Sequence, residues 1–184
     1  RKIYPLFGRI SASKDSFVGA IRDLSLVYEG DVYGSAFANE ITQRMPNETN
    51  YIIQDVTITV HGNILPMLRA YWTQNGNDNN TEAYAAGFAY HMDGVDVKNI
   101  QIYIKGNIGA LQPKQYEQAD TELIYARSSG FFFARTLRGT GAEQSIQNIT
   151  IQVDGSILAG SRHFRAEALG LGYDLQDKKL KDIT

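Results

Sequence analysis

The sequence predicts an all-β protein, a parallel β-helix or β-solenoid of about four coils with long loop insertions. The first observation is a phrase of about twelve residues that occurs four times and begins a fifth time. The second is that apolar and polar residues alternate within each copy, as in strands with one buried face. The third is that the copies begin at uneven intervals, at residues 21, 53, 97, 146 and 180. Stacked coils tolerate insertions of different lengths, whereas a hairpin protein would not repeat one strand sequence so closely at variable intervals.

The phrase reads apolar, any residue, Asp or Asn, apolar at every second position, any residue, Gly, polar, apolar. Its alternating apolar residues are expected to face a core, and they are Leu24, Leu26 and Tyr28; Val56, Ile58 and Val60; Ile100, Ile102 and Ile104; Ile149, Ile151 and Val153. A positive-φ glycine is expected to end each strand, at Gly30, Gly62, Gly106 and Gly155. An Asp or Asn is expected to bond backbone N–H groups at each strand entrance, at Asp23, Asp55, Asn99, Asn148 and Asp182.

A looser motif, small–Gly–aromatic–small, separates the copies. It occurs at residues 86–89 (AGFA) and 129–134 (SGFFFA), with a related form at 168–172 (ALGLG). We expect these segments to be the second strands of each coil, with small residues where the backbone passes close to a neighbour. No domain boundary is visible, so residues 1–184 are interpreted as a single β-solenoid repeat segment. Because the sequence starts at Arg1 and ends within a repeat, we expect a fragment of a longer protein.

Composition narrows the range of partners. The chain has 18 basic and 20 acidic residues and a formal net charge of −2, which gives no electrostatic reason to expect nucleic acid. No apolar run approaches the roughly 20 residues of a membrane span, and no signal peptide is visible. Cysteine is absent, which excludes disulfides and Cys-based zinc sites and fits long bacterial or protist surface proteins. Glycosylation sequons begin at Asn47, Asn79 and Asn148, as in a surface glycoprotein.

Two elements alternate along most of the chain. Residues 6–10 (LFGRI) precede 21–26 (IRDLSL), and residues 86–89 (AGFA) precede 97–102 (VKNIQI). This alternation resembles the GLUG repeat, in which a Gly-Leu-apolar-Gly element alternates with an Ile-x-Asn-Leu element. The resemblance implies a right-handed β-solenoid of the adhesin type, located at the cell surface or outside the cell. Here the glycine element is often replaced by other small residues, and the insertions are longer than a compact repeat needs.

Two columns of side chains are expected to run outward along the stack. The first contains Glu29, His61, Lys105 and Asp154. With neighbouring strands about 4.8 Å apart, it would place Lys105 against Asp154 and His61 against Lys105. A solvated ladder with a weak ion pair explains this column better than an acid/base pair. The second contains the Asp or Asn at the third position of each phrase. These residues are predicted to cap turns and not to bind calcium, because the dense Gly-Gly-x-Gly-x-Asp spacing of calcium-binding repeats is missing. No metal is expected.

The densest group of ionisable residues is Arg162, His163, Arg165 and Glu167. A polysaccharide lyase would need one basic residue to neutralise a uronate and another group to take a proton. A glycoside hydrolase would need two or three carboxylates close together, and the outward strand positions supply few. The sequence therefore predicts no catalytic residue, no cofactor and no enzyme.

Ligand binding is predicted for one insertion, which contains Tyr71, Trp72, Asn75 and Asn77. Sugar rings stack on aromatic faces while amides bond hydroxyl groups. The alternative is that Trp72 packs under its own loop.

The favoured function is a structural or adhesive extracellular surface module that presents its insertion loops to a partner. Its expected partners are other segments of the same long chain and a cell-surface glycan or protein. The alternative is a carbohydrate-binding or polysaccharide-processing β-helix domain. A filament subunit is a third reading, because an uncapped stack exposes strand edges.

Overall fold

The computed structural model describes residues 2–12, 20–43, 51–70, 81–111, 123–133, 144–160, 165–172 and 178–184. This part of the chain is all-β, because it consists of strands and the turns between them and contains no helix. It accordingly has no helix of the length and apolar character needed to cross a membrane.

The described strands form four sheets. The long sheet contains β2 (Ala20–Tyr28), β5 (Tyr51–Val60), β10 (Val95–Ile104), β14 (Gln144–Val153) and β17 (Lys178–Ile183). The second sheet contains β3 (Val32–Tyr33), β6 (Ile64–Leu65), β11 (Ile108–Ala110) and β15 (Ile157–Ala159). The third sheet contains β7 (Met67–Ala70), β8 (Thr81–Ala86), β12 (Leu123–Ser129) and β16 (Arg165–Leu169). The fourth sheet contains β1 (Phe7–Ala12), β4 (Ala38–Gln43), β9 (Ala89–Asp93) and β13 (Phe132–Phe133).

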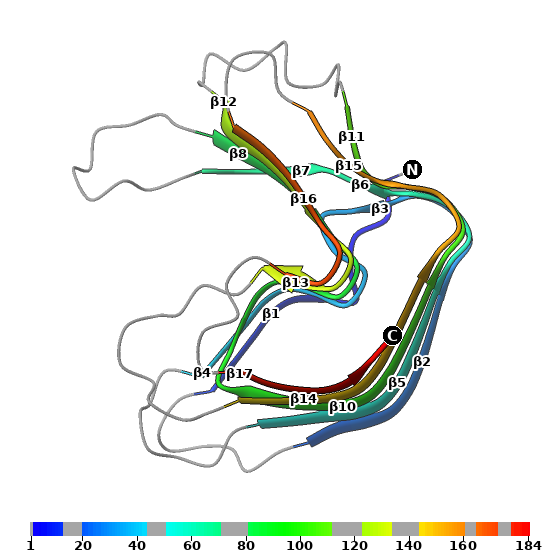
Figure 1. The fold of residues 1–184 in the computed structure, drawn as a ribbon, viewed down its shortest axis with the longest axis vertical. Helices are drawn as coiled ribbons and strands as arrows, with labels where there is room; N and C mark the ends of the chain where they lie inside the picture. Colours follow the sequence, from blue (N-terminus) through cyan, green and yellow to red (C-terminus); the bar gives the residue numbers. More distant parts are fainter. Residues whose placement is uncertain are drawn as a thin grey trace, which may run out of the picture.

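The chain passes through these sheets in the same order several times. We call the successive passes unit 1 (20–43), unit 2 (51–93), unit 3 (95–133) and unit 4 (144–172). Paired strands are parallel, apart from β7 and β8. Figure 1 looks along the stack and shows the strands of the long sheet lying one behind another. The prediction of an all-β fold with parallel sheets is confirmed.

The register of the long sheet aligns the repeated phrase. Ile53 of unit 2 pairs with Ile21 of unit 1 and Val97 of unit 3, and Val97 pairs with Ile146 of unit 4. Leu180 of the partial fifth copy pairs with Ile146. Each phrase position therefore forms a column that runs through the stack.

The Asp or Asn at the third phrase position has a left-handed backbone in every copy, with φ between 51° and 57°. Asn and Asp tolerate this conformation better than other non-glycine residues. The residue interrupts the alternation, so Ile53 and Val56, three positions apart, are both buried. Such irregularities bend strands, and the long sheet curves around the core in Figure 1. The prediction that these side chains bond backbone N–H groups is wrong for Asp55, Asn99 and Asn148. Their described hydrogen bonds join one side chain to another.

The phrase glycines do not provide positive-φ corners. Among the described glycines that backbone belongs to Gly34, Gly94 and Gly109, so the prediction for the phrase glycines is wrong. Gly62, Gly106 and Gly155 instead allow close approach between units. A Cβ on Gly106 would lie 2.5 Å from Oδ1 of Asn63 and 2.6 Å from the carbonyl oxygen of Gly62. No real Cβ approaches other atoms so closely, so the corner requires glycine.

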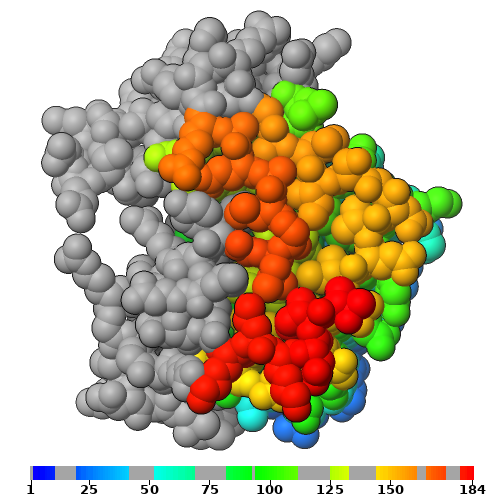
Figure 2. Space-filling model, viewed as in Figure 1, coloured from blue at the N-terminus to red at the C-terminus, as the bar shows by residue number. Residues whose placement is uncertain are grey.

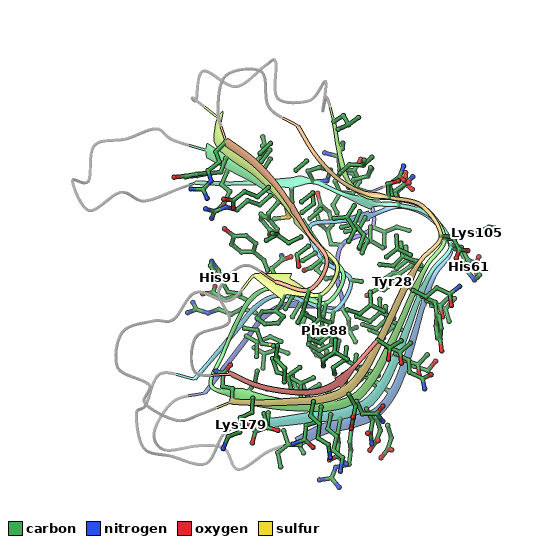
Figure 3. The ribbon with its side chains drawn as sticks, viewed as in Figure 1. Tyr28, His61, Phe88, His91, Lys105 and Lys179 are labelled. Carbon is green, nitrogen blue, oxygen red and sulfur yellow. The ribbon has the colours of Figure 1, made fainter. Side chains whose placement is uncertain are left out.

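The core is a stack of aromatic rings and branched aliphatic side chains. Phe37, Phe88 and Phe131 are fully buried, and their rings stack with centroid distances of 4.6 Å and 4.8 Å. Phe7 adds an edge-on contact to Phe37 at 5.2 Å. Figure 3 places Phe88 in the interior, between the fourth sheet and the long sheet.

The small–Gly–aromatic motif lies at the corner between the third and fourth sheets and not within a second strand, so that prediction is wrong. Gly87 and Phe88, for example, join β8 to β9. The predicted close approach is confirmed, because a Cβ on Gly87 would lie 1.9 Å from the carbonyl oxygen of Gly130.

Burial decreases toward one end of the stack. Ile102 of unit 3 is fully buried, whereas Ile151, its partner in unit 4, is half-buried. Figure 2 shows this end, where the described residues from 144 onward face the viewer.

Candidate functional site

The predicted ligand-binding residues Tyr71, Trp72, Asn75 and Asn77 lie outside the described residues. The strands on both sides of them are described. β7 and β8 pair antiparallel, and Ala70 is opposite Thr81. Ala70 and Thr81, the described residues on either side of segment 71–80, are thus held together at the edge of the third sheet.

β7 has a structural role of its own. Unit 1 passes directly from β3 to β4 and contributes no strand to the third sheet. β7 lies beside β8 at this edge, where a strand of unit 1 would otherwise pair. An unpaired edge strand invites unwanted pairing, and β7 covers that edge of β8.

Three connections reach the third sheet at the same corner. The segments 71–80, 112–122 and 161–164 each precede a strand of this sheet, namely β8, β12 and β16. Because these strands are parallel neighbours, their first residues lie side by side, as Figure 1 shows. We call this region, defined by the described residues 81–84, 123–127 and 165–167, the third-sheet corner. It places Thr81 of β8, the described residue that follows segment 71–80, in the same sheet as Arg165 and Glu167 of β16.

A buried ionic network lies at the third-sheet corner. Nη1 of Arg127 is 2.8 Å from Oε1 of Glu82, and its Nε is 3.0 Å from Oε2 of Glu167. The exposed fractions of the side chains are 2% for Glu82, 14% for Arg127 and 9% for Glu167. Burial acts to lower the pKa of Arg127, but the charges of Glu82 and Glu167 outweigh it, so the pKa is raised. The guanidinium therefore stays charged and joins units 2, 3 and 4.

Tyrosines surround this network. The Tyr90 hydroxyl donates to Oε2 of Glu82. The Tyr90 ring lies 4.1 Å from that of Tyr84, and both residues are buried. The Tyr125 ring lies 4.3 Å from the Arg127 guanidinium, within cation–π range. The network is thus closed to solvent on several sides.

Two residues of the predicted ionisable cluster belong to this region. Arg165 and Glu167 are described, whereas Arg162 and His163 lie outside the described residues. Nε of Arg165 is 2.5 Å from Oε1 of Glu167, but it is not aligned for a hydrogen bond, and this buried oxygen accepts none. The Arg165 side chain is 60% exposed. Arg165 is therefore the cation of this network that solvent reaches most easily.

The geometry limits what this network does chemically. Both carboxylates contact arginine, and Glu82 is nearly inaccessible. A glycosidase pair needs an acid and a base or nucleophile on either side of a substrate bond. Glu82 and Glu167 instead have a guanidinium between them. The arrangement is suited to holding three units together, with Arg165 and Tyr125 at its edge.

The exposed charged column is present as a stack but not with the predicted ion pairs. Backbone N–H groups of His61, Lys105 and Asp154 each donate to the preceding unit. The described ion pair joins His61 to Glu29 at 3.8 Å, and Asp154 accepts from Gln152. The predicted Lys105–Asp154 pair is wrong. Figure 3 shows His61 and Lys105 at the outer bend of the molecule, where such pairs contribute little stability.

The Asp/Asn column forms a hydrogen-bonded ladder. Asn148 donates to Oδ1 of Asn99, and Asn99 donates to Oδ1 of Asp55, each at 2.8 Å. Gln54 donates to the other oxygen of Asp55. The amide of Asn148, the first residue of a sequon, is thus occupied by the ladder. Within the described ranges, no group of three His, Asp or Glu side chains is placed to hold a metal ion.

The buried network was not predicted from the sequence. A signal was available, because Arg127 and Glu167 each stand three positions before the glycine of the small–Gly motif, Gly130 and Gly170. Residues at the same distance from an aligned glycine lie side by side in a stack. Arg127 and Glu167 indeed pair in register. Glu82 could not be found this way, because it stands five positions before Gly87 and pairs in register with Tyr125, whereas Arg127 pairs with Tyr84.

No protein-family model, curated protein or solved structure matches this chain. The resemblance to GLUG repeats stays a prediction. The function is therefore inferred from the residues of the chain and their geometry.

Proposed function

We propose that residues 1–184 are a β-solenoid of about four coils that serves as a structural or adhesive module at an extracellular surface. In this proposal the units form the scaffold, and the connections at the third-sheet corner are presented to a partner. The partner is a cell-surface glycan or protein, and other segments of the same long chain are neighbours in the stack.

The observation that supports this proposal best is the use of repeated polar residues for contacts between units. One ladder joins Asn148, Asn99 and Asp55. A second uses side-chain oxygens that accept the backbone N–H of the next unit, in the order Asp31 to Asn63, Asn63 to Asn107 and Asn107 to Ser156. The side chains of these polar residues already form hydrogen bonds between units. We therefore assign partner recognition to the connections, where solenoids commonly carry it.

The third-sheet corner is the best location for binding. The segment 71–80, with Tyr71, Trp72, Asn75 and Asn77, connects β7 to β8, and the antiparallel pairing of these strands places Ala70 opposite Thr81 at this corner. A rigid anchor lowers the entropy that a binding loop loses when it engages a ligand. The exposed Arg165 side chain and the partly exposed Tyr125 lie at the same corner. Aromatic rings beside amide and guanidinium donors form a suitable surface for a sugar or a polar peptide.

The alternative, a carbohydrate-binding or polysaccharide-processing domain, has one specific observation in its favour. Two glutamates and two tyrosines lie at the third-sheet corner, namely Glu82, Glu167, Tyr84 and Tyr125, and Tyr90 of β9 donates a hydrogen bond to Glu82. Processing would require one carboxylate to separate from Arg127. Simple adhesion requires no such change, and for this reason it is the preferred proposal.

A glycan array combined with a polysaccharide-depolymerisation screen tests both functions. The variants are Trp72→Ala and a control, Tyr103→Ala, which removes a partly exposed aromatic ring from the outer face of the long sheet. Binding that Trp72→Ala abolishes and Tyr103→Ala preserves would support an adhesive site in segment 71–80. Turnover of a polysaccharide would favour the alternative. Binding that neither variant affects would place the site elsewhere and contradict the proposed location.

A further inference from the structure

The two end faces of the described stack extend different sheets. Residues 2–12 extend the second and fourth sheets beyond unit 1, because Ile3 pairs with Val32 and β1 pairs with β4. Among the described strands, β2 is the last of the long sheet at this end. At the other end β17 pairs with β14, and it is the described strand that lies beyond unit 4. Figure 2 shows residues 178–184 in red, covering part of this end face.

These two end faces have complementary shapes. The long sheet is recessed at the β2 end and projects at the β17 end, relative to the second and fourth sheets. If the β17 end of one copy met the β2 end of another, β17 would occupy the recess beside β2. Ile3 and β1 of the second copy would then extend the second and fourth sheets of the first. The third sheet would not continue, because β7 runs antiparallel at its edge.

Both end faces expose part of the apolar core. In the first phrase position, Ile53, Val97 and Ile146 of the inner units are buried. Ile21 at one end is half-buried, and Leu180 at the other end is 39% exposed. Within the described chain, the partly buried side chains that pack against the core all lie in residues 3–28 or 151–183. A second copy on either face would remove apolar surface from water, which is favourable.

The register within the chain specifies how two copies would meet. Neighbouring strands of the long sheet align identical phrase positions. Continued to a second copy, this register places Leu180 opposite Ile21. In the second sheet it places Ile157 opposite Ile3, because one column contains Val32, Ile64, Ile108 and Ile157. Both contacts pair apolar residues, as the contacts between the units of one chain do.

We propose that copies of this chain bind one another head to tail through their two end faces. The occupant of each face is a second copy, held by the same kinds of contact that stack units 1 to 4. Because the contact joins two different surfaces, it is heterologous and forms an open linear assembly unless its rotation closes a ring. The inference does not depend on the proposed adhesive function, since it requires no glycan or other protein.

Charged side chains oppose this contact and make it depend on salt. In the second phrase position, basic residues alternate with glutamine in register, in the order Arg22, Gln54, Lys98, Gln147 and Lys181. Between copies, however, Lys181 would face Arg22 and Asp182 would face Asp23. Like charges directly opposite each other destabilise a strand pair, and salt screens exposed charges. Higher ionic strength should therefore strengthen the association, whereas it would weaken a contact held by ion pairs.

Sedimentation equilibrium of the purified chain measures the association. We expect the average mass to rise with concentration, and the dissociation constant to fall by about 2- to 5-fold between about 0.05 M and about 0.5 M NaCl. Arg22→Gln should lower the dissociation constant by a similar factor at low salt. The control Lys105→Gln removes an exposed cation of unit 3 and should behave like the wild type. A monomer at every concentration, or association that salt weakens, would overturn the proposal.

Intermolecular disulfides identify the two faces that meet. The chain has no cysteine, so Arg22→Cys and Lys181→Cys are introduced into separate chains, which are then mixed and oxidised. Both side chains are exposed, so each variant should fold. In the proposed register the two positions are neighbours about 4.8 Å apart, a spacing that suits a disulfide. We expect mixed dimers to exceed either homodimer by about 10-fold.

A matched control replaces Arg22→Cys with Val27→Cys. Val27 is 57% exposed on the same strand, but it lies five residues from Arg22, or about 16 Å along the strand. Mixed with Lys181→Cys, it should give no excess of mixed dimers. Homodimers as abundant as mixed dimers would show random collision or association through other faces. That result, or an equal excess with Val27→Cys, would also overturn the proposal.

Discussion

Asn99 donates its side-chain Nδ2 to Oδ1 of Asp55 at 2.8 Å, although 44 positions separate the two residues in the sequence. Both have a left-handed backbone, and both occupy the third position of the repeated phrase. The same side chain accepts a hydrogen bond from Asn148, 49 positions later. One phrase position therefore supplies both the bend of each strand and a polar connection to the next unit.

Replacing Asn99 with Asp should destabilise the protein. The change removes the donor to Asp55 and places two carboxylates in contact. We expect a loss of about 1–3 kcal/mol in the free energy of unfolding at neutral pH, measured by urea denaturation. The control Asp55→Asn keeps an acceptor for Asn99 and loses only the hydrogen bond from Gln54, so it should cost less than about 1 kcal/mol. Equal effects of the two substitutions would argue against a directional ladder.

Gly106→Ala should also be costly, because its Cβ would lie 2.5 Å from Oδ1 of Asn63 in the preceding unit. To relieve this clash the two units would have to move apart or break the hydrogen bond from Asn107 to Asn63. We expect a loss of about 2 kcal/mol or more, again from denaturant unfolding. Gly8→Ala is the matched control, because a Cβ there meets no atom within 4 Å. A harmless Gly106→Ala would contradict the close approach of the units.

The phenylalanine stack predicts a gradient along the molecule. Phe88 lies between Phe37 and Phe131 and is fully buried, whereas Phe7 is at the end of the stack and is partly buried. Phe88→Ala should cost about 3–5 kcal/mol, and Phe7→Ala less than half as much. Thermal and urea unfolding of both variants measure the difference. A larger loss for Phe7 would show that the stack is not the centre of the core.

Tyr28 ties the first described residues to unit 1. Its hydroxyl donates to the Ala36 carbonyl oxygen at 2.8 Å and accepts from the Leu6 N–H at 3.2 Å. Burial raises the pKa of Tyr28, and the bond from Leu6 opposes this only in part. The contribution of Tyr28 to stability is therefore complete below the unfolded pKa and is lost as pH rises through the folded one. Tyr28→Phe should cost about 1–2 kcal/mol near neutral pH. Stability curves should show this deficit shrinking above about pH 10, and a constant deficit would contradict the account.

The sequence predicted the arrangement of the long sheet well. The phrase beginning at Ile21, Ile53, Val97, Ile146 and Leu180 gave the strands and their parallel neighbours in order. This succeeded because a stack repeats one chemical environment, so each position receives the same type of residue in every unit. The bend at the third position was missed. Its trace was the spacing of three between inward residues such as Ile53 and Val56, where a regular strand would have two.

The candidate site was harder to predict for a physical reason. Glu82, Arg127 and Glu167 are different residue types in different units, and each pair is joined across 40 or 45 positions. An ionic network needs opposite charges in neighbouring units, so it cannot appear as a repeated letter. The predicted binding residues near Trp72 lie outside the described residues, and their role stays a prediction.

Disulfide trapping tests most directly whether the phrase stacks in parallel register between units. The chain has no cysteine, so an engineered pair is unambiguous. Thr57 and Gln101 are register partners in β5 and β10, and parallel neighbours about 4.8 Å apart suit a disulfide. Thr57→Cys with Gln101→Cys should form an intramolecular disulfide readily. Thr57→Cys with Tyr103→Cys is offset by two residues, or about 8 Å, and should not. A disulfide that forms mainly in the offset pair, or failure of both pairs to form one, would contradict the stacked register on which the proposed scaffold depends.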